Sequence, residues 1–402
     1  MPKLRVGLLV NPIAGLGGAA AFKGSDGHWK EALEQGYTPT APERARRFVE
    51  LVGDAVEWVT VPGAMGGDDI RSARLVLPDA GFKLGGTSRE DTVRAAQALR
   101  DAKVDLLCFL GGDGTATDVS KAVDSTVPCL GVPAGVKITS PVYTHDVAEA
   151  AWLVAQLRPG FETTQRDTTD LDEVAYRAGD VDITLTGSLK VPLSPAIQDG
   201  KVATPTETPL GPLIEQVLRE WDTEALTFVG AGSVCQAVKA QFWGKPTLLG
   251  VDAIQGSRIV QADVDAHKIQ DLVDRELAKP GGLVRIVLST IGGQGMLLGR
   301  GTQMFTPEVI RKVGWDNLKV VAPPEKLQGL KGLHIDTGDP ELDASAPKHI
   351  RVTAGWNETR LLKILTGTRA PPEPRDGREA QGAGGSGGTG GMGDGTHAAA
   401  SK

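Results

Sequence analysis

Cysteine, aromatic residues and long apolar runs are scarce in this 402-residue chain, and each scarcity excludes a class of protein. The three cysteines, Cys108, Cys129 and Cys235, are widely spaced in mostly apolar surroundings, which favours reduced core thiols over a disulfide framework. Aromatic residues make up only 4% and form no base-stacking pattern. No apolar run approaches the roughly 18 residues of a membrane-spanning helix, and the first run is too short for a signal peptide. We therefore expect a cytoplasmic protein that does not bind membranes.

A surplus of positive charge is missing as well. The chain has 43 Lys and Arg against 50 Asp and Glu, which gives a formal net charge of −7. Without an overall basic field no nucleic-acid partner is expected, so any polyanion must be bound by a local site. The 6 histidines show no metal-ligand spacing, which argues against a zinc site.

The order of apolar segments predicts two folded domains and a tail. The length alone exceeds the roughly 250 to 300 residues at which single cores stop growing. Residues 1–155 alternate apolar strand patterns with helix patterns, which predicts an α/β domain around a parallel sheet. Residues 156–370 include alternating strand patterns at 181–185 and 187–191, which predict a β-rich second domain that ends in further strand–helix units. Residues 371–402 are rich in Gly and Ala, and we expect them to be disordered.

The loop with the clearest chemical signal follows an apolar strand pattern and leads into a helix pattern. It reads Gly111-Gly112-Asp113-Gly114-Thr115. Glycines let a phosphate approach the backbone, and a helix N-terminus offers it free N–H groups. A carboxylate at Asp113 then suits a Mg²⁺ ligand, or a base that accepts the proton of an attacking hydroxyl. The alternative is a sharp turn with Asp113 near a helix start.

A second Gly-rich loop follows the first predicted strand. It contains Asn11, Gly15 and Gly17, and it continues to Lys23 and Asp26. The Gly15 and Gly17 spacing formally fits a dinucleotide fingerprint, but the helix and the acidic partner do not follow at the required distances. Lys23 does not complete a P-loop either, because Gly24 rather than Ser or Thr comes next. The loop is a candidate phosphate or substrate lid, with a plain surface loop as the alternative.

A third loop contains Gly135 and Lys137 after a short apolar strand pattern. Alone it reads as a turn. Three Gly-rich loops that follow parallel strands, however, would line one edge of the sheet, where ligands of such sheets bind. We therefore expect the three loops to form one composite phosphate site.

Together these motifs resemble the ATP-NAD kinase-like branch of the superfamily that joins NAD kinases, diacylglycerol kinases and phosphofructokinases. The resemblance spans about residues 4–365. It rests on the Gly111 to Thr115 motif, Asn11-Pro12, and residues 23–27, 132–137 and 291–295. It implies a Rossmann-like parallel-sheet N-terminal domain, a β-rich C-terminal domain and an active site in the cleft between them.

The resemblance also implies a reaction. Asp113 would activate the 2′-hydroxyl of the adenosine ribose of NAD. ATP or polyphosphate would donate the phosphoryl group with the help of Mg²⁺, and NADP would be the product. The Asn-Glu pair with which NAD kinases hold their nucleotide has no literal match, and its stand-ins are Asp170, Asp172 and Glu173. From the residues alone, these acids could equally be a solvated strand edge.

A loop of the second domain is another candidate phosphate cradle. Gly230, Gly232 and Ser233 lie between a strand pattern and a helix pattern. Relatives usually have Thr at the position of Val234, so one hydroxyl donor is lost here.

Arg300 is the candidate for bidentate phosphate binding in the second domain. It lies in a Gly-Arg-Gly-Thr-Gln motif in which Thr302 replaces the Asn that relatives usually carry. Its alternative role is a structural ion pair. Residues 336–340 also recur in the branch, but two carboxylates around Gly and Pro are typical of an ordinary turn.

The residues and the resemblance together predict an NAD kinase-like phosphotransferase with NAD and ATP as small-molecule partners, acting as a homo-oligomer. One alternative keeps the fold and changes the acceptor to another hydroxyl compound, such as a sugar, polyol or lipid headgroup. Another is a nucleotide-binding regulatory protein that has lost catalysis, consistent with Val234 and Thr302. A dehydrogenase would need a hydride-transfer site that the sequence does not offer.

Overall fold

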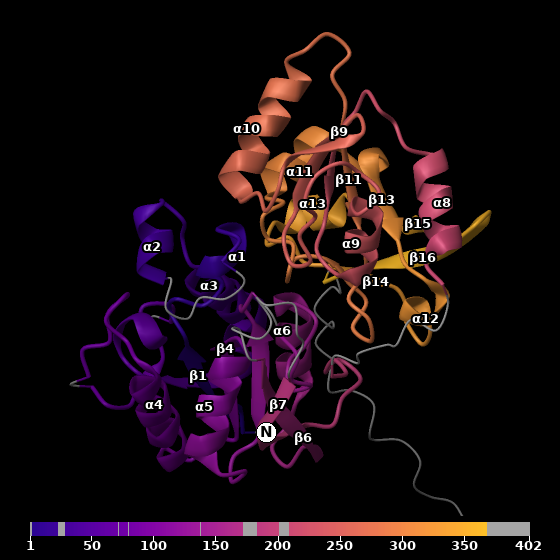
Figure 1. The fold of residues 1–402 in the computed structure, drawn as a ribbon. Coiled ribbons are helices and arrows are strands. Elements are labelled where there is room, and N and C mark those ends of the chain that lie inside the picture. Colours follow the sequence, from indigo (N-terminus) through magenta and orange to yellow (C-terminus); the bar gives the residue numbers. More distant parts are fainter. Residues whose placement is uncertain are drawn as a thin grey trace, which may run out of the picture. The chain divides into compact units, whose positions relative to one another are not determined.

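The computed structural model describes seven stretches of the chain, which carry two main sheets and a separate hairpin (Figure 1). The described stretches are residues 2–22, 29–70, 72–78, 80–136, 138–171, 183–200 and 209–367. The tail for which we predict disorder, residues 371–402, lies outside them.

The first sheet has five parallel strands in the order β3-β2-β1-β4-β5. Its central strands are almost wholly buried apolar segments, as expected for a sheet covered on both faces. This confirms the predicted α/β domain around a parallel sheet. The strands are β1 (Leu4–Val10), β2 (Val56–Thr60), β3 (Arg74–Leu75), β4 (Leu106–Gly111) and β5 (Cys129–Pro133).

The helices of this region connect the parallel strands, and α4 packs beside α5 while α3 packs beside α6. The Ser88 hydroxyl accepts from the Asp91 backbone N–H and the Asp91 side chain accepts from Ser88, so the predicted capping box opens α4. The helices are α1 (Leu16–Ala19), α2 (Trp29–Glu34), α3 (Ala41–Val52), α4 (Arg89–Asp101), α5 (Asp113–Val123) and α6 (Val147–Gln156), with 3₁₀ turns η1 (Gly53–Ala55) and η2 (Gly63–Met65).

An antiparallel hairpin of β6 (Thr163–Leu171) and β7 (Ile183–Pro192) follows α6. Two short strands were expected at 181–185 and 187–191, but the described part of this segment is one strand. A register shift between Thr168 and Thr169 of the partner strand produces the apparent break. The hairpin packs against α5 and β5, and its buried residues Leu189 and Val191 belong to the hydrophobic cluster of the first sheet.

The second sheet has nine strands in the order β10-β9-β8-β11-β13-β15-β16-β14-β12. Its middle strands β8, β11, β13 and β15 are parallel, with antiparallel pairs at β10–β9, β9–β8 and β15–β16. The expected β-rich second domain with returning strand–helix units is therefore present. The strands are β8 (Leu226–Val229), β9 (Asp252–Gln255), β10 (Arg258–Gln261), β11 (Val284–Leu288), β12 (Met296–Leu298), β13 (Leu318–Val321), β14 (Leu333–Ile335), β15 (His349–Gly355) and β16 (Glu358–Thr366).

The helices of the second region are α8 (Gly211–Arg219), α9 (Ser233–Lys239), α10 (Ala266–Leu277), α11 (Pro307–Val313), α12 (Pro324–Leu327) and α13 (Pro340–Ala344), with the 3₁₀ turn η3 (Trp315–Asn317). Its core forms two apolar clusters. The larger one also takes in Leu16, Ala32 and Tyr37 from the first region, so α1, α2 and the segment after α2 pack with the second sheet. The division at residue 155 stays a prediction.

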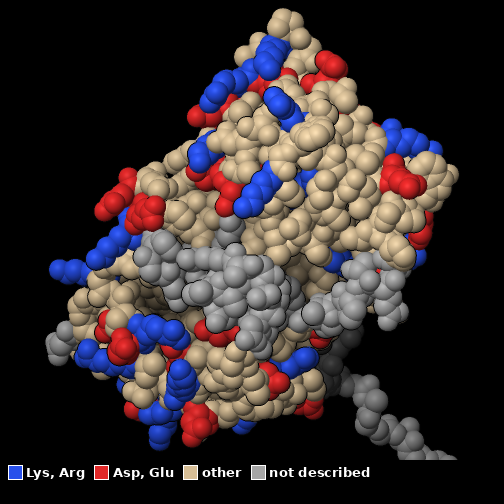
Figure 2. Space-filling model, in the orientation of Figure 1, with Lys and Arg blue, Asp and Glu red and all other residues tan. Residues whose placement is uncertain are grey.

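Charged side chains are interspersed over the face drawn in Figure 2, where neither sign gathers in one extended patch. Within the described residues, no helix is long and apolar enough to cross a membrane.

Candidate active site

The three Gly-rich loops that follow β1, β4 and β5 contact one another. The Asn11 side-chain amide donates to the Thr115 hydroxyl over 3.0 Å. The Gly135 backbone N–H donates to the Gly111 carbonyl oxygen over 2.9 Å. A Cβ on Gly135 would lie only 2.6 Å from the Gly112 Cα, so the backbones meet at a distance that only glycine allows. The sequence places these residues in one site, and the structure brings them together.

Gly15 allows the first and third loops to come close to each other. Its φ is +84°, and a Cβ there would lie 2.0 Å from the Thr40 hydroxyl and 2.7 Å from the Ala134 carbonyl oxygen. Gly17 is buried within α1, whereas Gly114 is partly exposed and has open space on its side-chain side. Gly114 therefore leaves room for a ligand at the start of α5.

Asp113 is the first residue of α5 and is only 7% exposed. Its Oδ2 accepts from the Thr139 backbone N–H and hydroxyl, both over 2.7 Å, and its Oδ1 accepts from the Ser140 backbone N–H over 3.0 Å. Burial raises the pKa of the Asp113 carboxyl, and the hydrogen bonds from Ser140 and Thr139 act against that rise. Asp113 is thus a buried carboxylate that accepts three hydrogen bonds from the segment after the third loop and fixes it, and it does not cap its own helix.

The segment that binds Asp113 is itself held by β6. The Thr139 and Thr169 hydroxyls lie 2.8 Å apart, and the Ser140 hydroxyl donates to the Thr169 carbonyl oxygen over 3.1 Å. Asp170, the next residue, lies close enough for its charge to raise the pKa of Tyr143. Of the predicted acidic set, Asp170 is therefore near the site.

Tyr143 fixes the turn that precedes Asp113. Its hydroxyl donates to the Gly112 carbonyl oxygen over 2.6 Å, and its ring lies edge-on to Phe109 of β4. Burial, with a smaller contribution from the charge of Asp113, raises the pKa of the Tyr143 hydroxyl. This keeps it a neutral donor to the Gly112 carbonyl.

Arg300 is the most unusual charged side chain of the site. It is 4% exposed, and none of its three guanidinium nitrogens has a hydrogen-bond partner in the described structure. Burial lowers its pKa to about 10, with the Arg44 cation acting in the same direction, while the charges of Asp336, Asp113 and Asp146 act against that fall. An unpartnered buried guanidinium strongly favours an anion, and phosphate oxygens match its fork of donors.

The turn that carries Arg300 is rigid. Gly299 and Gly301 have φ values of +117° and +81°, a region that glycine adopts without strain. The Thr302 hydroxyl accepts from the Gly299 N–H over 3.0 Å and also bonds the Gly299 carbonyl. Thr302, which replaces the Asn of relatives, therefore stabilises the turn that carries Arg300.

Side chains from outside the third loop hold three carbonyl oxygens of residues 133–138. The bonds are Arg44 Nη1 to Pro133 O (3.2 Å), Gln303 Nε2 to Gly135 O (3.4 Å) and Gln294 Nε2 to Ile138 O (3.1 Å). Arg44 Nη1 also lies 2.6 Å from Asp336 Oδ2, in an ion pair between the partly buried Arg44 and the buried Asp336. The turn expected at residues 336–340 is therefore only partly right: Asp339 caps α13, but Asp336 is buried and paired.

The loop of Gly230, Gly232 and Ser233 does lie between β8 and α9 as expected. Within the described residues, no hydrogen bond or ion pair joins it to Asp113 or Arg300. Val234 is completely buried in the third apolar cluster, so the position of the missing hydroxyl is a core position.

The other predicted site residues, Lys23, Asp26, Lys137, Asp172 and Glu173, lie outside the described residues. Sequence reasoning missed Thr139, Ser140, Tyr143 and Arg44, which hold Asp113 and its loops. The only signal for the first two was a pair of hydroxyl residues just after the third Gly-rich loop.

The described residues offer no ready metal centre, since none of them form a group of three or more His, Cys, Asp or Glu side chains suited to a metal ion. Both Asp113 oxygens already accept hydrogen bonds, and the Arg300 cation lies within range of its charge. In this conformation Asp113 does not fit the role of a Mg²⁺ ligand.

These features define a class: a two-domain α/β protein whose Gly-rich loops meet at one edge of a parallel sheet. Residues 6–157 match the ATP-NAD kinase N-terminal domain, and residues 227–364 match the ATP-NAD kinase C-terminal domain. The chain belongs to the ATP-NAD kinase family, which confirms the resemblance seen in its motifs. This membership implies a kinase, and the family generally uses ATP and a divalent cation. A search of curated proteins found no match to the chain.

Proposed function

We propose that this protein transfers a phosphoryl group from ATP or polyphosphate to the 2′-hydroxyl of NAD and so makes NADP. The observation that carries the proposal is the buried guanidinium of Arg300, which lacks a partner in the described structure and lies within electrostatic range of the buried carboxylate of Asp113. A base and a phosphate-binding cation in one dry site are what phosphoryl transfer to a hydroxyl requires.

Each group has a defined task in this proposal. Arg300 binds phosphate oxygens and stabilises the charge that develops on them during transfer. Asp113 accepts the proton of the attacking 2′-hydroxyl, and its raised pKa makes it a stronger base than an exposed aspartate. The open space beside Gly114 and the N-terminus of α5 receive the phosphates.

A divalent cation would neutralise the donor phosphates. Because Asp113 is occupied, we propose that the phosphate oxygens and water supply most of the ligands of Mg²⁺. Asp113 Oδ1 accepts only the Ser140 N–H, so one of its lone pairs is left for the proton of the hydroxyl. Lys23, Asp26, Lys137, Asp170, Asp172, Glu173 and the loop of Gly230, Gly232 and Ser233 remain candidate nucleotide ligands.

The hydrogen bonds that Asp113 accepts also favour a second candidate, a nucleotide-binding protein without turnover. Both of its carboxylate oxygens accept hydrogen bonds from within the protein, which suits a structural role. Such a protein would bind NAD but consume no phosphoryl donor.

The test incubates the purified full chain with Mg²⁺, NAD and either ATP or polyphosphate, and detects NADP with an NADP-specific dehydrogenase. We expect NADP with at least one donor. Asp118→Asn is the matched control for Asp113→Asn, because Asp118 is another buried carboxylate of α5 but pairs with Arg89 of α4. NAD binding without NADP formation would contradict the kinase proposal and support the second candidate, a nucleotide-binding protein without turnover.

A further inference from the structure

A cavity of about 450 Å³ borders the candidate active site and shares Asp146 and Gln294 with its surroundings. Its lining comes from residues 145–149, 195–199, 293–294, 329–334 and 363–367, and it includes neither Asp113 nor Arg300. Its volume falls within the range of pockets that hold small molecules.

The carboxylates of this cavity already have partners. Glu149 lies 2.8 Å from the His145 Nδ1, and Asp146 accepts the Glu149 backbone N–H over 2.7 Å. Asp199 is largely exposed and lies 3.8 Å from an Arg166 nitrogen. Glu149 and Asp146 are therefore held by hydrogen bonds within the protein, and Asp199 faces the solvent.

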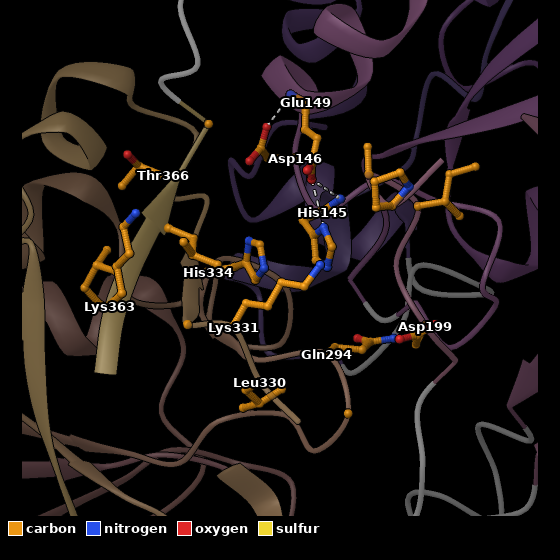
Figure 3. A pocket seen from close by; sticks show the side chains of 18 of the residues that line it. His145, Asp146, Glu149, Asp199, Gln294, Leu330, Lys331, His334, Lys363 and Thr366 are labelled. Carbon is orange, nitrogen blue, oxygen red and sulfur yellow. Dashed lines mark hydrogen bonds and ion pairs between the residues drawn. The ribbon is translucent and has the colours of Figure 1, made fainter. Parts of the chain in front are cut away.

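The lysines of the cavity differ from its acids. Lys331 and Lys363 both line the cavity and are exposed, and no described carboxylate pairs with either. Figure 3 shows the Lys331 side chain extending toward the His145 ring. Two ammonium groups without a carboxylate partner favour an anion at the part of the cavity that they line.

Flat and apolar surfaces accompany these charges. The rings of His145 and His334 stack with their centroids 3.8 Å apart and their planes 2° apart (Figure 3). Ile197, Leu330 and Ile364 add apolar side chains to the lining. Cations beside flat and apolar surfaces suit a ligand that joins phosphate to a planar ring.

We propose that this cavity is a second binding site, and that it takes a phosphate-bearing ligand of up to nucleotide size, with Lys331 and Lys363 binding the phosphates. The site goes beyond the proposed reaction, because binding here needs neither Asp113 nor an acceptor. Its anion can come from a nucleotide or from an inorganic phosphate chain.

The experiment titrates the full chain with ADP and, separately, with inorganic tripolyphosphate by calorimetry at low ionic strength, with no NAD present. We expect the double variant Lys331→Ala/Lys363→Ala to bind at least one of the two about tenfold more weakly or worse, since each lost lysine removes a charge-assisted contact. The control variant Lys121→Ala/Lys319→Ala removes two exposed lysines that do not line the cavity and should bind like the wild type.

The two ligands separate the sources of the anion. Loss of ADP binding alone points to a nucleotide, and equal loss of both points to phosphate recognition without the ring. Unchanged titrations in the lysine double variant, or loss only in Arg300→Met, would overturn the proposal, because the anion would then bind elsewhere. The ligand-induced rise in Tm provides a second readout. Since no turnover is measured, an inactive chain can still confirm this site, and an active chain can still refute it.

Discussion

The two halves of the candidate active site differ in whether their buried charged groups have hydrogen-bond partners. The carboxylate of Asp113, at the edge of the first sheet, accepts three hydrogen bonds from Thr139 and Ser140. The guanidinium of Arg300, in a turn beside the second sheet, is as deeply buried and has no hydrogen-bond partner in the described structure. The first half is complete without a ligand, while the second lacks an anion.

The difference indicates that the half of the site with Arg300 is less favourable for stability than the half with Asp113. A hydrogen-bonded buried carboxylate supports its own fold, whereas the buried Arg300 cation has a desolvation cost that the charges of Asp336, Asp113 and Asp146 offset only in part. Proteins retain such strained groups where binding or catalysis needs them. The comparison therefore predicts opposite signs for the stability effects of removing the two charges.

The largest expected effect is that of Asp113→Asn on turnover. Loss of the base should lower kcat at least about 10²-fold. The variant should also lose about 1–3 kcal/mol of unfolding free energy, because one of the N–H groups of Thr139 or Ser140 would then face an amide NH₂ instead of an oxygen. Steady-state kinetics and urea unfolding measure the two effects.

Asp118→Asn serves as the control, because it removes a buried carboxylate from the same helix without touching Thr139. It should lose stability while keeping kcat near wild type. A folded Asp113→Asn protein with wild-type turnover would make Asp113 purely structural, and the kinase proposal would fall with it.

The second prediction pairs Arg300→Met with Arg44→Met. Arg300→Met removes a cation without a hydrogen-bond partner and should raise the free energy of unfolding by about 1–3 kcal/mol. Arg44→Met leaves Asp336 buried without its ion pair, so this variant should lower the free energy of unfolding by about 3 kcal/mol. Chemical unfolding of both variants measures this difference in sign.

Arg300→Met should also weaken the binding of NAD or ATP at least about tenfold, since a charge-assisted contact to phosphate is lost. If instead Arg300→Met destabilises the protein and leaves nucleotide affinity intact, the guanidinium has a structural partner and the contrast with Asp113 disappears.

The third prediction concerns Asp146, one of the carboxylates whose charge acts on Arg300. Burial, with the nearby charge of Asp336, raises the pKa of Asp146 from 3.8 to about 7. Between these two values the folded state holds a proton that the unfolded state has lost, so stability falls as pH rises toward 7 and stays reduced above it. Asn cannot titrate, yet it is an equally good cap for α6.

We therefore expect Asp146→Asn to raise Tm over the wild type by a larger margin at pH 8 than at pH 5. Asp343, whose pKa burial raises to about 6, titrates in both proteins and cancels in the comparison. An equal margin at both pH values would show that Asp146 does not titrate in this range.

Much of the fold was predictable because strand and helix signals are local. The apolar segment at residues 104–110 nearly matches β4, and Ser88 with Asp91 marks the start of α4. The meeting of the Gly-rich loops followed from a general rule about parallel sheets, which needs no knowledge of side-chain contacts.

The contacts that define the candidate site could not be predicted in the same way. Arg44 and Asp336 are 292 positions apart, and their pairing depends on how two sheets pack. Arg300 lies between two glycines, a pattern typical of an exposed turn, so its burial could not be predicted from the sequence. Val234 looked like a changed ligand only because its neighbours resemble a phosphate loop.

The smallest expected effect sharpens the comparison within the second sheet, where two loops were candidates for anion binding and the turn of Arg300 lies within electrostatic range of Asp113. Val234→Thr should leave NAD affinity unchanged within about twofold and lower the free energy of unfolding by about 1–2 kcal/mol, because Val234 is completely buried and a hydroxyl would enter an apolar cluster. Calorimetric titration and urea unfolding give both numbers. Tighter NAD binding by Val234→Thr at unchanged stability would instead show that the side chain at position 234 reaches the nucleotide.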